Sequence, residues 1–290
     1  MQSLWMLAAS FFFATMGMFI KLSSSTHNLG EIVLFRGLPS VFFILAYALR
    51  NQLPLFGSNL KTHARRNMVG ITSMWMGFYG TTHLPLGTAT TLNYTSPLFI
   101  AIFLLYQSYF PGILRAQWLR FGAIVLGFVG VLCIFNPFIE TNLNHAALFI
   151  ALLGGMMGAL AYMTVRSLGR MGEPEWRTVL LFSCSVVLSG LVGIAILGVS
   201  SYTLHSTLHL IGIGLAGMGG QLCMTRAFSR GSATLTATLQ YTTILFSAVF
   251  GYWVWGETIH LSGIIGMVLV IVSGLAATLY ARKNVPAKAI

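Results

Sequence analysis

Long apolar runs, separated by short polar or turn-forming segments, set the pattern of this chain. No charged residue lies between Arg66 and Arg115, and none lies between Arg177 and Arg226. A helix needs about 20 apolar residues to cross the hydrocarbon of a bilayer, so each run is long enough for two helices joined by a turn. The expected turns are residues 83–87 and 200–203, which contain Pro, Gly, Ser and Thr.

The same reasoning along the whole chain predicts an all-α integral membrane protein with ten transmembrane helices. The N-terminus has no basic segment and no small-residue cleavage site, so we interpret the first helix as a retained span and not as a signal peptide. The predicted spans are residues 3–21, 31–49, 67–84, 87–107, 118–136, 146–166, 176–198, 207–227, 232–255 and 260–281.

Composition excludes a soluble globular protein. Of the 290 residues, 56% are hydrophobic and only 7% are charged, against roughly 25% charged residues in an average soluble domain. The 16 Lys and Arg residues far outnumber the five acids, giving a net charge of +11. In a soluble protein this excess would suggest nucleic acid, but in a membrane protein it reports orientation. We therefore expect no nucleic-acid partner.

Most basic residues lie on one side of the predicted bundle. They fall in alternate connections and in the C-terminal tail, and Arg66 is assigned to the connection between the second and third spans. The exceptions are Lys21, at the end of the first span, and Arg36, inside the second span. Because Lys and Arg collect on the cytoplasmic side, both termini are expected to be cytoplasmic.

The chain also contains a weak internal repeat. At an offset of 147 residues, Tyr94–Phe99 lies on Tyr241–Phe246, and Asn93 lies on Gln240. This offset is close to half the length of the chain. Fixed-period similarity of this kind is the sequence signature of a repeat architecture, so we predict a two-fold duplication.

Duplication divides the chain into two five-helix halves, residues 1–140 and 141–290. Because five is an odd number, the second half enters the membrane from the opposite side, which gives an inverted-topology repeat. This architecture is common in secondary transporters, whose substrate sites lie near the midplane between the repeats. Some channels and membrane enzymes are also duplicated, so the repeat alone leaves those classes open.

Two stretches carry a resemblance to a known family. One is residues 83–99, HLPLGTATTLNYTSPLF, and the other is Trp255–Thr258, WGET, followed by the glycine-spaced residues 263–266. With Arg36 early in the second span, these stretches resemble the EamA-type family of the drug/metabolite transporter superfamily. The resemblance covers nearly the whole chain and is specific for the family, but not for the substrate.

The resemblance implies a carrier of small organic metabolites in the plasma membrane, which in a bacterium is the inner membrane. It also implies a central cavity built largely by the first, third, fourth, sixth, eighth and ninth spans. One departure is visible, because residues 109–111 read Tyr-Phe-Pro where the second half has Gly256–Glu257. The Gly-Glu pair is therefore not duplicated.

Polar residues near the middle of two predicted spans are the first candidates for a substrate site. Asn93 and Tyr94 lie near the centre of one span, and Gln240 and Tyr241 are their counterparts in the second half. Polar groups inside hydrocarbon are costly and usually face the bundle interior or a wet cavity. Amides and phenols there can bind an uncharged or zwitterionic ligand. Hydrogen bonding between helices is the alternative role.

Pro97 lies in the middle of the predicted span 87–107. Proline removes one backbone hydrogen bond and usually kinks a helix, so we predict a kink at this position. The freed carbonyl groups could line a cavity or act as a hinge. A static packing kink is the alternative interpretation.

Three further positions are candidates for substrate contact. Trp75 and Tyr79 are four residues apart and share a helix face, which would suit a planar ring or a cation; core packing is the alternative. Gln221 is a polar residue inside a span. Arg36 could attract a substrate carboxylate or phosphate, but we favour a structural ion pair with Glu31 or Glu257.

The positions of the acids constrain how transport is driven. Proton-coupled carriers commonly use a carboxylate or histidine within the membrane, whereas none of the five glutamates is predicted near the midplane. We therefore predict alternating access by facilitated diffusion or substrate exchange. Proton-coupled efflux through Glu31 or Glu257 and lipid flipping are the alternatives. The acids are Glu31, Glu140 and Glu257 on the external side, and Glu173 and Glu175 on the cytoplasmic side.

An enzyme is not expected, because no catalytic motif occurs and no loop is long enough for a catalytic domain. No metal or cofactor is expected either, since the cysteines Cys133, Cys184 and Cys223 lack metal-ligand spacing. The expected partners are a small-molecule substrate and the lipid bilayer, with the chain a monomer or a homodimer. The neutral-polar and aromatic candidates suggest an amino-acid or nucleoside-like substrate, for example S-adenosylmethionine.

Overall fold

The computed structural model describes residues 2–57, 59–84, 92–107, 114–135, 144–256 and 261–283. All regular secondary structure within these residues is helical, which confirms the predicted all-α class. The elements are η1 (Gln2–Leu4), α1 (Trp5–Ser23), α2 (Leu29–Arg50), α3 (Leu60–His83), α5 (Ser96–Gln107), α6 (Leu114–Phe135), α7 (His145–Arg170), α8 (Glu175–Leu197), α9 (Leu204–Arg230), α10 (Ala233–Leu239), α11 (Thr242–Trp255) and α12 (Leu261–Lys283).

Six stretches in the described part of the chain are long and apolar enough to cross a membrane. Their side chains are less than half buried overall, except in the last stretch, so apolar surface faces outward as a lipid environment requires. These stretches are Gln2–Ser23, Leu29–Arg50, His145–Arg170, Glu175–Leu197, Leu204–Arg230 and Ala233–Trp255. Length and composition therefore support a multi-pass membrane protein.

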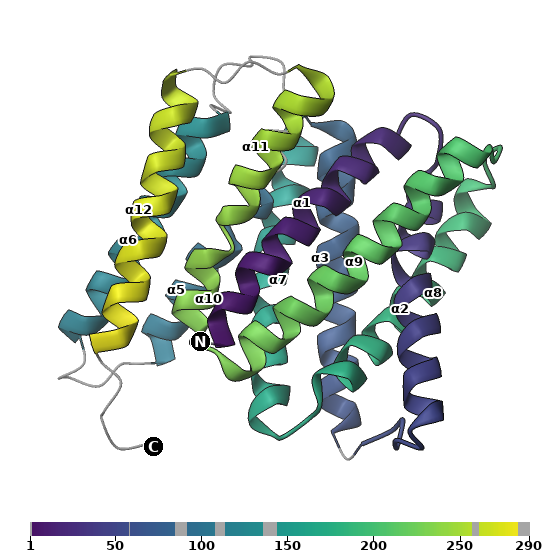
Figure 1. The fold of residues 1–290 in the computed structure, drawn as a ribbon, viewed down its shortest axis with the longest axis horizontal. Helices are drawn as coiled ribbons and strands as arrows, with labels where there is room; N and C mark the ends of the chain where they lie inside the picture. Colours follow the sequence, from purple (N-terminus) through teal and green to yellow (C-terminus); the bar gives the residue numbers. More distant parts are fainter. Residues whose placement is uncertain are drawn as a thin grey trace.

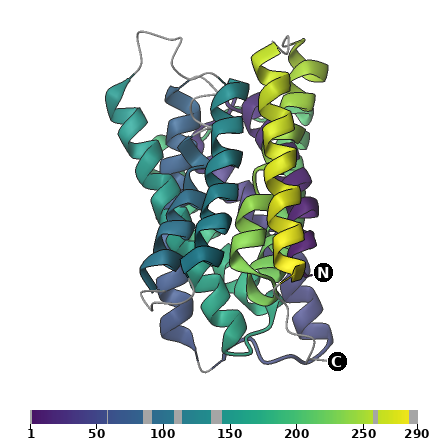
Figure 2. The same cartoon turned by 90° about the vertical axis from the view of Figure 1, so that its left-hand side faces the viewer.

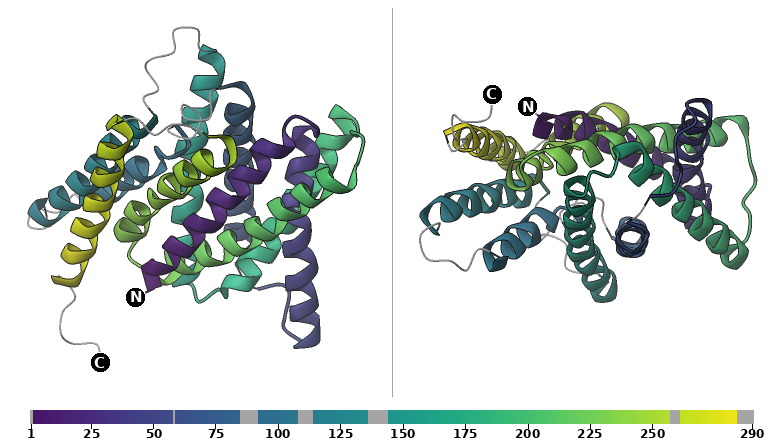
Figure 3. Two further views of the ribbon diagram at one scale, coloured as in Figure 1. Left: turned by 45° about the horizontal axis from the view of Figure 1, so that its top comes forward. Right: turned by 90° about the horizontal axis from the view of Figure 1, so that it is seen from below.

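The helices form a bundle in which partners come from distant parts of the sequence. The most extensive contacts join α2 with α8, α3 with α7, α1 with α9, and α6 with α12. The α6–α12 and α2–α8 pairs lie at opposite flanks of the bundle (Figures 1 and 3), and Figure 2 shows α6 and α12 side by side. Each pair takes one helix from before residue 140 and one from after it. The two sequence halves therefore pack against each other helix by helix.

Glycines allow the α2–α8 pair to approach closely. A Cβ atom on Gly30 would lie 2.6 Å from the backbone of Gly193, and one on Gly190 would lie 2.6 Å from the backbone of Leu34. Real Cβ atoms do not approach other atoms so closely. Small residues at helix interfaces are the usual way in which membrane helices gain packing contacts.

Two predicted spans are interrupted and not continuous. Residues 92 and 93 are helical, Tyr94 and Thr95 form a turn, and α5 begins at Ser96. In the second half, α10 ends at Leu239 and α11 begins at Thr242, with a turn between them. Pro97 therefore lies in the first turn of α5, where its missing N–H costs nothing. The kink predicted at Pro97 is replaced by a break that precedes it.

Threonine side chains stabilise both breaks. Thr95 Oγ1 donates to the carbonyl oxygen of Leu92 at 2.6 Å, and Thr242 Oγ1 donates to that of Leu239 at 2.7 Å. Thr243 Oγ1 donates in the same way to the Gln240 carbonyl at 2.9 Å. Such local side-chain bonds compete with the helical ladder, so the second break forms without a proline.

Candidate functional site

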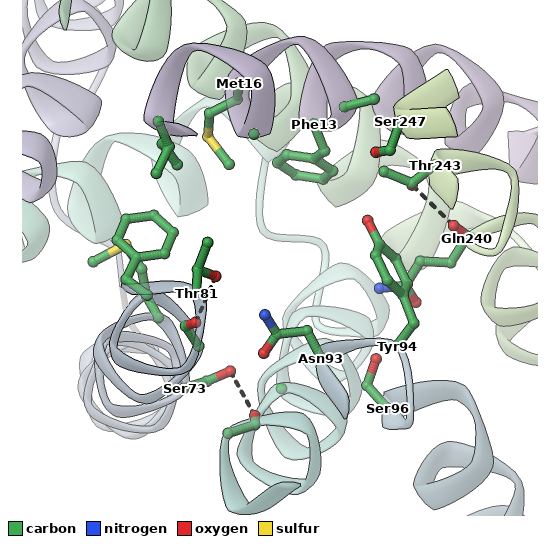
Figure 4. A pocket seen from close by; sticks show the side chains of 18 of the residues that line it. Phe13, Met16, Ser73, Thr81, Asn93, Tyr94, Ser96, Gln240, Thr243 and Ser247 are labelled. Atoms are coloured by element: carbon green, nitrogen blue, oxygen red, sulfur yellow. Dashed lines mark hydrogen bonds between the residues drawn. The ribbon is translucent and has the colours of Figure 1, made fainter. Parts of the chain in front are cut away.

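A cavity of about 280 Å³ lies inside the bundle, between α1, α3, α7, α9, α11 and the turn after residue 93 (Figure 4). Its lining extends to Lys21, Thr81 and Trp255, at the C-terminal ends of α1, α3 and α11. These helix ends lie opposite η1 and the C-terminal end of α12 (Figure 1). The cavity is therefore built mainly by six predicted spans, the first, third, fourth, sixth, eighth and ninth. The second span adds Arg36 and the seventh adds Phe182.

Five of the candidate residues lie at this cavity. The structure places their side chains on four different elements, so residues far apart in sequence meet at one site. Asn93, Tyr94 and Gln240 are visible around the cavity in Figure 4. The complete set is Arg36, Asn93, Tyr94, Gln221 and Gln240.

The two mid-span amides lie at the breaks of their helices. Asn93 faces α3, where a Cβ on Gly77 would lie 2.9 Å from its Oδ1 atom. Gln240 Nε2 donates to the hydroxyl of Tyr162 on α7 at 3.0 Å. Its Oε1 atom is buried and has no hydrogen-bond partner among the described residues. Gln240 therefore links two helices with one end of its amide and leaves the other end available beside the cavity.

Tyr241 lies elsewhere, although it follows Gln240 directly. Its side chain is fully buried and packs against α6, where a Cβ on Gly127 would lie 2.6 Å from the tyrosine ring. Ile124 and Ile244 surround the same ring. Tyr241 is therefore a packing residue between α6 and the second helix break, outside the cavity.

The aromatic pair on α3 also lies outside the cavity. Trp75 Nε1 donates to Ser189 Oγ on α8 at 3.3 Å, and its ring fills the space above Gly193. Tyr79 stacks on His83 with a centroid distance of 4.0 Å. The shared face of Trp75 and Tyr79 thus serves packing and does not form a wall of the cavity.

Arg36 is hydrogen-bonded to a residue that the sequence did not indicate as its partner. Its Nη2 atom donates to Gln221 Oε1 on α9 at 3.0 Å, and its side chain is buried. Glu31 forms no ion pair with Arg36, because its carboxylate accepts hydrogen bonds from Ser200 and Tyr202 instead. The other proposed partner, Glu257, lies outside the described residues. The predicted Arg36–Glu31 ion pair is wrong.

Arg66 is the main cavity residue that the sequence reasoning missed. The predicted third span began at residue 67, whereas α3 begins at Leu60. Arg66 consequently lies in the second turn of the helix, buried and lining the cavity, and not in a cytoplasmic connection. A signal was present, because the cavity residues of α3 recur at helical spacing. They are Arg66, Gly70, Ser73, Gly77 and Thr81.

Further cavity residues come from α1, α7 and α11. Phe13 and Met16 supply apolar surface, and Thr243 and Ser247 supply hydroxyl groups (Figure 4). Tyr162 stacks on Phe228 with a centroid distance of 4.9 Å and an interplanar angle of 3°. The lining therefore combines aromatic, thioether, amide and hydroxyl groups, which suits a small organic molecule with both polar and apolar parts.

The charges at the cavity have one sign. Lys21, Arg36 and Arg66 line it, whereas no described glutamate does. Glu173 and Glu175 lie at the end of the bundle remote from Trp255. No group of side chains that could hold a metal ion occurs among the residues that the structure describes.

The comparisons with known proteins agree with this architecture. The pseudopaline exporter of Pseudomonas aeruginosa is 31% identical over 276 residues, covering 92% of each chain. The S-adenosylmethionine uptake transporter of Rickettsia bellii is 26% identical, covering 90% of this chain and 87% of the relative. One solved crystal structure shares the fold with a TM-score of 0.76, at 15% identity over 95% of this chain and 98% of that chain.

A family model gives the most direct assignment. The model of the EamA-like transporter family matches residues 1–136 and 145–279, which is nearly the whole sequence. The relatives named above are transporters and not enzymes. Together with the apolar helices, these matches indicate a membrane transporter of metabolites. The chain belongs to the EamA-like transporter family.

Proposed function

We propose that this protein is a secondary transporter that moves a small organic metabolite across the plasma membrane by alternating access. The cavity is the observation that carries the proposal. It is surrounded by helices, and its lining reaches the helix ends at Lys21, Thr81 and Trp255. At the other end, Met6, Phe228 and Leu239 form part of a buried apolar cluster that fills the space between α1, α9 and α10.

Further contacts keep that end closed. The backbone N–H of Ser232 donates to Ser3 Oγ at 2.9 Å, which joins η1 to the start of α10. Ser10 Oγ on α1 donates to the Leu239 carbonyl at the second helix break. Closure of one end of a central cavity is what one state of an alternating-access carrier requires. A groove open to lipid, which a flippase needs, is a poorer description of a site ringed by helices.

The topology that we propose has ten spans in two inverted halves, residues 1–140 and 141–290, with both termini cytoplasmic. The helix breaks support it, because Tyr94 and Tyr241 both lie in the interruptions and are separated by the repeat offset. Broken helices near the interface of inverted repeats are a recurring feature of transporter sites. With this orientation the cavity extends toward the external side.

The substrate that we propose is amino-acid-like or nucleoside-like. The relatives are named for pseudopaline export and for S-adenosylmethionine uptake, and the amides and aromatic rings of the cavity suit molecules of this kind. Because no described glutamate lines the cavity, facilitated diffusion or exchange is favoured over proton coupling.

Reconstitution tests this function. Proteoliposomes and protein-free liposomes are incubated with a defined pool of amino acids, nucleosides and S-adenosylmethionine, and their contents are measured by mass spectrometry. We expect at least one member of the pool to accumulate only in the proteoliposomes, with no need for a pH gradient. Equal contents in both preparations would contradict transport. Accumulation that requires a pH gradient would show that the protein is a proton-coupled carrier and not a facilitator or exchanger.

A further inference from the structure

Two buried arginines line the cavity beside the ring of one aromatic residue, Phe182. Arg36 on α2 is 4% exposed and Arg66 on α3 is 2% exposed. The guanidinium carbon of Arg66 lies 3.6 Å from the ring centroid of Phe182 on α8, and that of Arg36 lies 5.4 Å from the same centroid. Three helices therefore bring two positive charges to one ring.

The donor groups of this pair are largely unused. Arg36 bonds Gln221 through Nη2, but its Nη1 atom has no hydrogen-bond partner within the described part of the chain. The Nε and Nη1 atoms of Arg66 are unpartnered in the same sense. Buried donors are almost always satisfied, and an unsatisfied donor on a charged group is especially costly. These atoms are thus arranged to meet an acceptor that the described chain does not supply.

The described glutamates are committed to other partners. Glu31 accepts hydrogen bonds from Ser200 and Tyr202, and Glu173 is paired with Arg177 at 2.8 Å. Glu175 is paired with Arg230 at 2.6 Å. Charges inside a membrane protein are normally neutralised by a partner. None of the described glutamates is left for the two arginines, and an anion that enters the cavity would balance them.

We propose that Arg36 and Arg66 form an oxyanion site that binds a carboxylate of the substrate, and that the transported metabolite is a small organic molecule that carries a carboxylate. That the metabolite is transported rests on the proposed function. The binding site itself is argued from the geometry of the two arginines alone. Guanidinium groups present planar donor forks that match carboxylates. Phe182 orients both forks, and Gln221 fixes Arg36.

The surrounding backbone leaves room for this arrangement. A Cβ on Gly70 would lie 2.5 Å from Arg66 Nη1 and 3.1 Å from Phe182 Cε2. A glycine one helical turn after Arg66 therefore lets the guanidinium lie flat over the ring. The remaining surface, with Asn93, Gln240 and the aromatic residues, would contact the rest of the substrate.

Ligand-induced thermal stabilisation of the purified protein in detergent tests the site. The probes are pairs of similar size that differ in charge, succinate with succinamide and propionate with propionamide, together with inorganic phosphate and putrescine. A ligand stabilises the state that it binds, so the melting temperature should rise more with each carboxylate than with its amide. Putrescine, a cation, should give no rise. Phosphate exceeding both carboxylates would contradict a carboxylate site and indicate a phosphate site.

Variants locate the effect. Arg66→Gln and Arg36→Gln should weaken the apparent affinity for the carboxylate about tenfold or more, since hydrogen bonds to charged groups are the strong ones. Arg66→Lys keeps the charge but loses the planar fork. Its affinity for the carboxylate should be intermediate between those of Arg66→Gln and the unmodified protein. Arg65→Gln is the matched control, because Arg65 is the exposed neighbour on the same helix. Equal losses of carboxylate affinity in Arg65→Gln and Arg66→Gln would overturn the proposal.

The melting temperature without ligand separates a binding role from a structural one. Arg66→Gln removes a buried charge whose Nε and Nη1 donors are unpartnered, so it should leave this temperature unchanged or raise it. A large drop with the carboxylate preference retained would show that Arg66 only holds the helices together. The two proposals fail separately: uptake limited to solutes without a carboxylate contradicts the oxyanion site, whereas Arg66-dependent binding without any uptake contradicts transport.

Discussion

Ser200 donates two hydrogen bonds to the carboxylate of Glu31, from its backbone N–H at 2.9 Å and from its hydroxyl at 2.6 Å. Tyr202 adds a third at 2.8 Å, and the glutamate side chain has no exposed surface. Glu31 also closes the capping box at the start of α2 with Asn28. One carboxylate therefore ties the loop after α8 to the beginning of α2.

The opposite end of the α2–α8 pair is tied in a related way. Glu173, just before α8, pairs with Arg177 at 2.8 Å and accepts a hydrogen bond from Asn59 in the connection after α2. Arg177 in turn donates to the carbonyl oxygen of Pro54 in the same connection. At each end, a buried glutamate near the start of one helix thus holds the segment that follows the other helix. We expect α2 and α8 to move as one unit.

Glu31→Gln should lower the stability of the protein. The change keeps the volume but removes the charge, and hydrogen bonds to a buried charged group contribute about 1.5–3 kcal/mol each. A loss of roughly 2–3 kcal/mol in the free energy of unfolding is therefore expected, measured by thermal or denaturant unfolding in detergent. Glu175→Gln is the control, because the ion pair of Glu175 with the half-exposed Arg230 is worth about 0–1 kcal/mol. Equal losses of unfolding free energy in Glu31→Gln and Glu175→Gln would show that the hydrogen bonds from Ser200 to Glu31 do not stabilise the fold.

Acidification should loosen the other end of the pair. Burial alone raises the pKa of Glu173, but hydrogen bonds from Asn59 and Arg177 outweigh burial and hold the pKa below its usual value. A carboxylate with a lowered native pKa stabilises the fold above its unfolded-state pKa of about 4.3 and loses that contribution as the pH falls further. The melting temperature should therefore decrease below this pH.

Glu173→Gln provides the matching comparison. The variant cannot titrate at this position, so its melting temperature should be lower near neutral pH and should depend less on pH in the acidic range. If the melting temperatures of the unmodified protein and of Glu173→Gln fall equally with pH throughout the acidic range, protonation of Glu173 does not cause the loss of stability. The same measurement on Glu175→Gln controls for the general effect of removing a cytoplasmic-end carboxylate.

Gly70→Ala should impair anion binding without unfolding the protein. The added Cβ would lie 2.5 Å from Arg66 Nη1, so the guanidinium must leave the face of Phe182. We expect the carboxylate-induced rise in melting temperature to shrink while the ligand-free value changes little, because alanine favours helix over glycine. Gly122→Ala on α6 is the control, since a Cβ there has no neighbour within 4 Å. An undiminished carboxylate response in Gly70→Ala would contradict the placement of Arg66.

The sequence predicts the helices well because their signal is local. A run of about 20 apolar residues between charges identifies a span, and the predicted centres agree with the described helices. The start of α3 was misplaced because Leu60–Asn67 contains Lys61, Arg65 and Arg66, which a search for apolar runs assigns to a connection. The helix continues into these residues, with Arg65 exposed and Arg66 buried. Only the spacing of small and polar residues on α3 distinguishes the two arginines.

The side-chain environments depend on information that a single sequence lacks. Trp75 and Tyr79 share a face by periodicity, but the sequence does not say whether α8 or the cavity covers that face. Gln240 and Tyr241 are adjacent in the second break, where a turn sends one side chain toward Tyr162 and the other toward α6. In a continuous helix, the side chains of Gln240 and Tyr241 would point in other directions relative to each other. The sequence predicts only a kink at Pro97, and it makes no prediction for the second break, which threonine side chains stabilise.

The arginine pair also predicts how the carrier reorients. Closing the empty cavity would bury Arg36 and Arg66 away from water without a counter-charge, and desolvation of uncompensated charges is costly. A bound carboxylate removes part of that cost, so the loaded protein should change conformation faster than the empty one. Exchange of an organic anion should therefore exceed its net uptake, and we expect the ratio to be about tenfold or more, which corresponds to a barrier difference of about 1.4 kcal/mol.

Uptake of a labelled organic anion into proteoliposomes, with and without the unlabelled compound inside, measures this ratio. Arg66→Gln halves the uncompensated charge of the pair, so its empty form should reorient more easily and its ratio of exchange to net uptake should fall toward one. Arg65→Gln should keep the ratio of the unmodified protein, because Arg65 is exposed and is not among the cavity residues. Equal rates of exchange and net uptake in the unmodified protein would show that the empty cavity closes freely, and that its two arginines are neutralised without substrate.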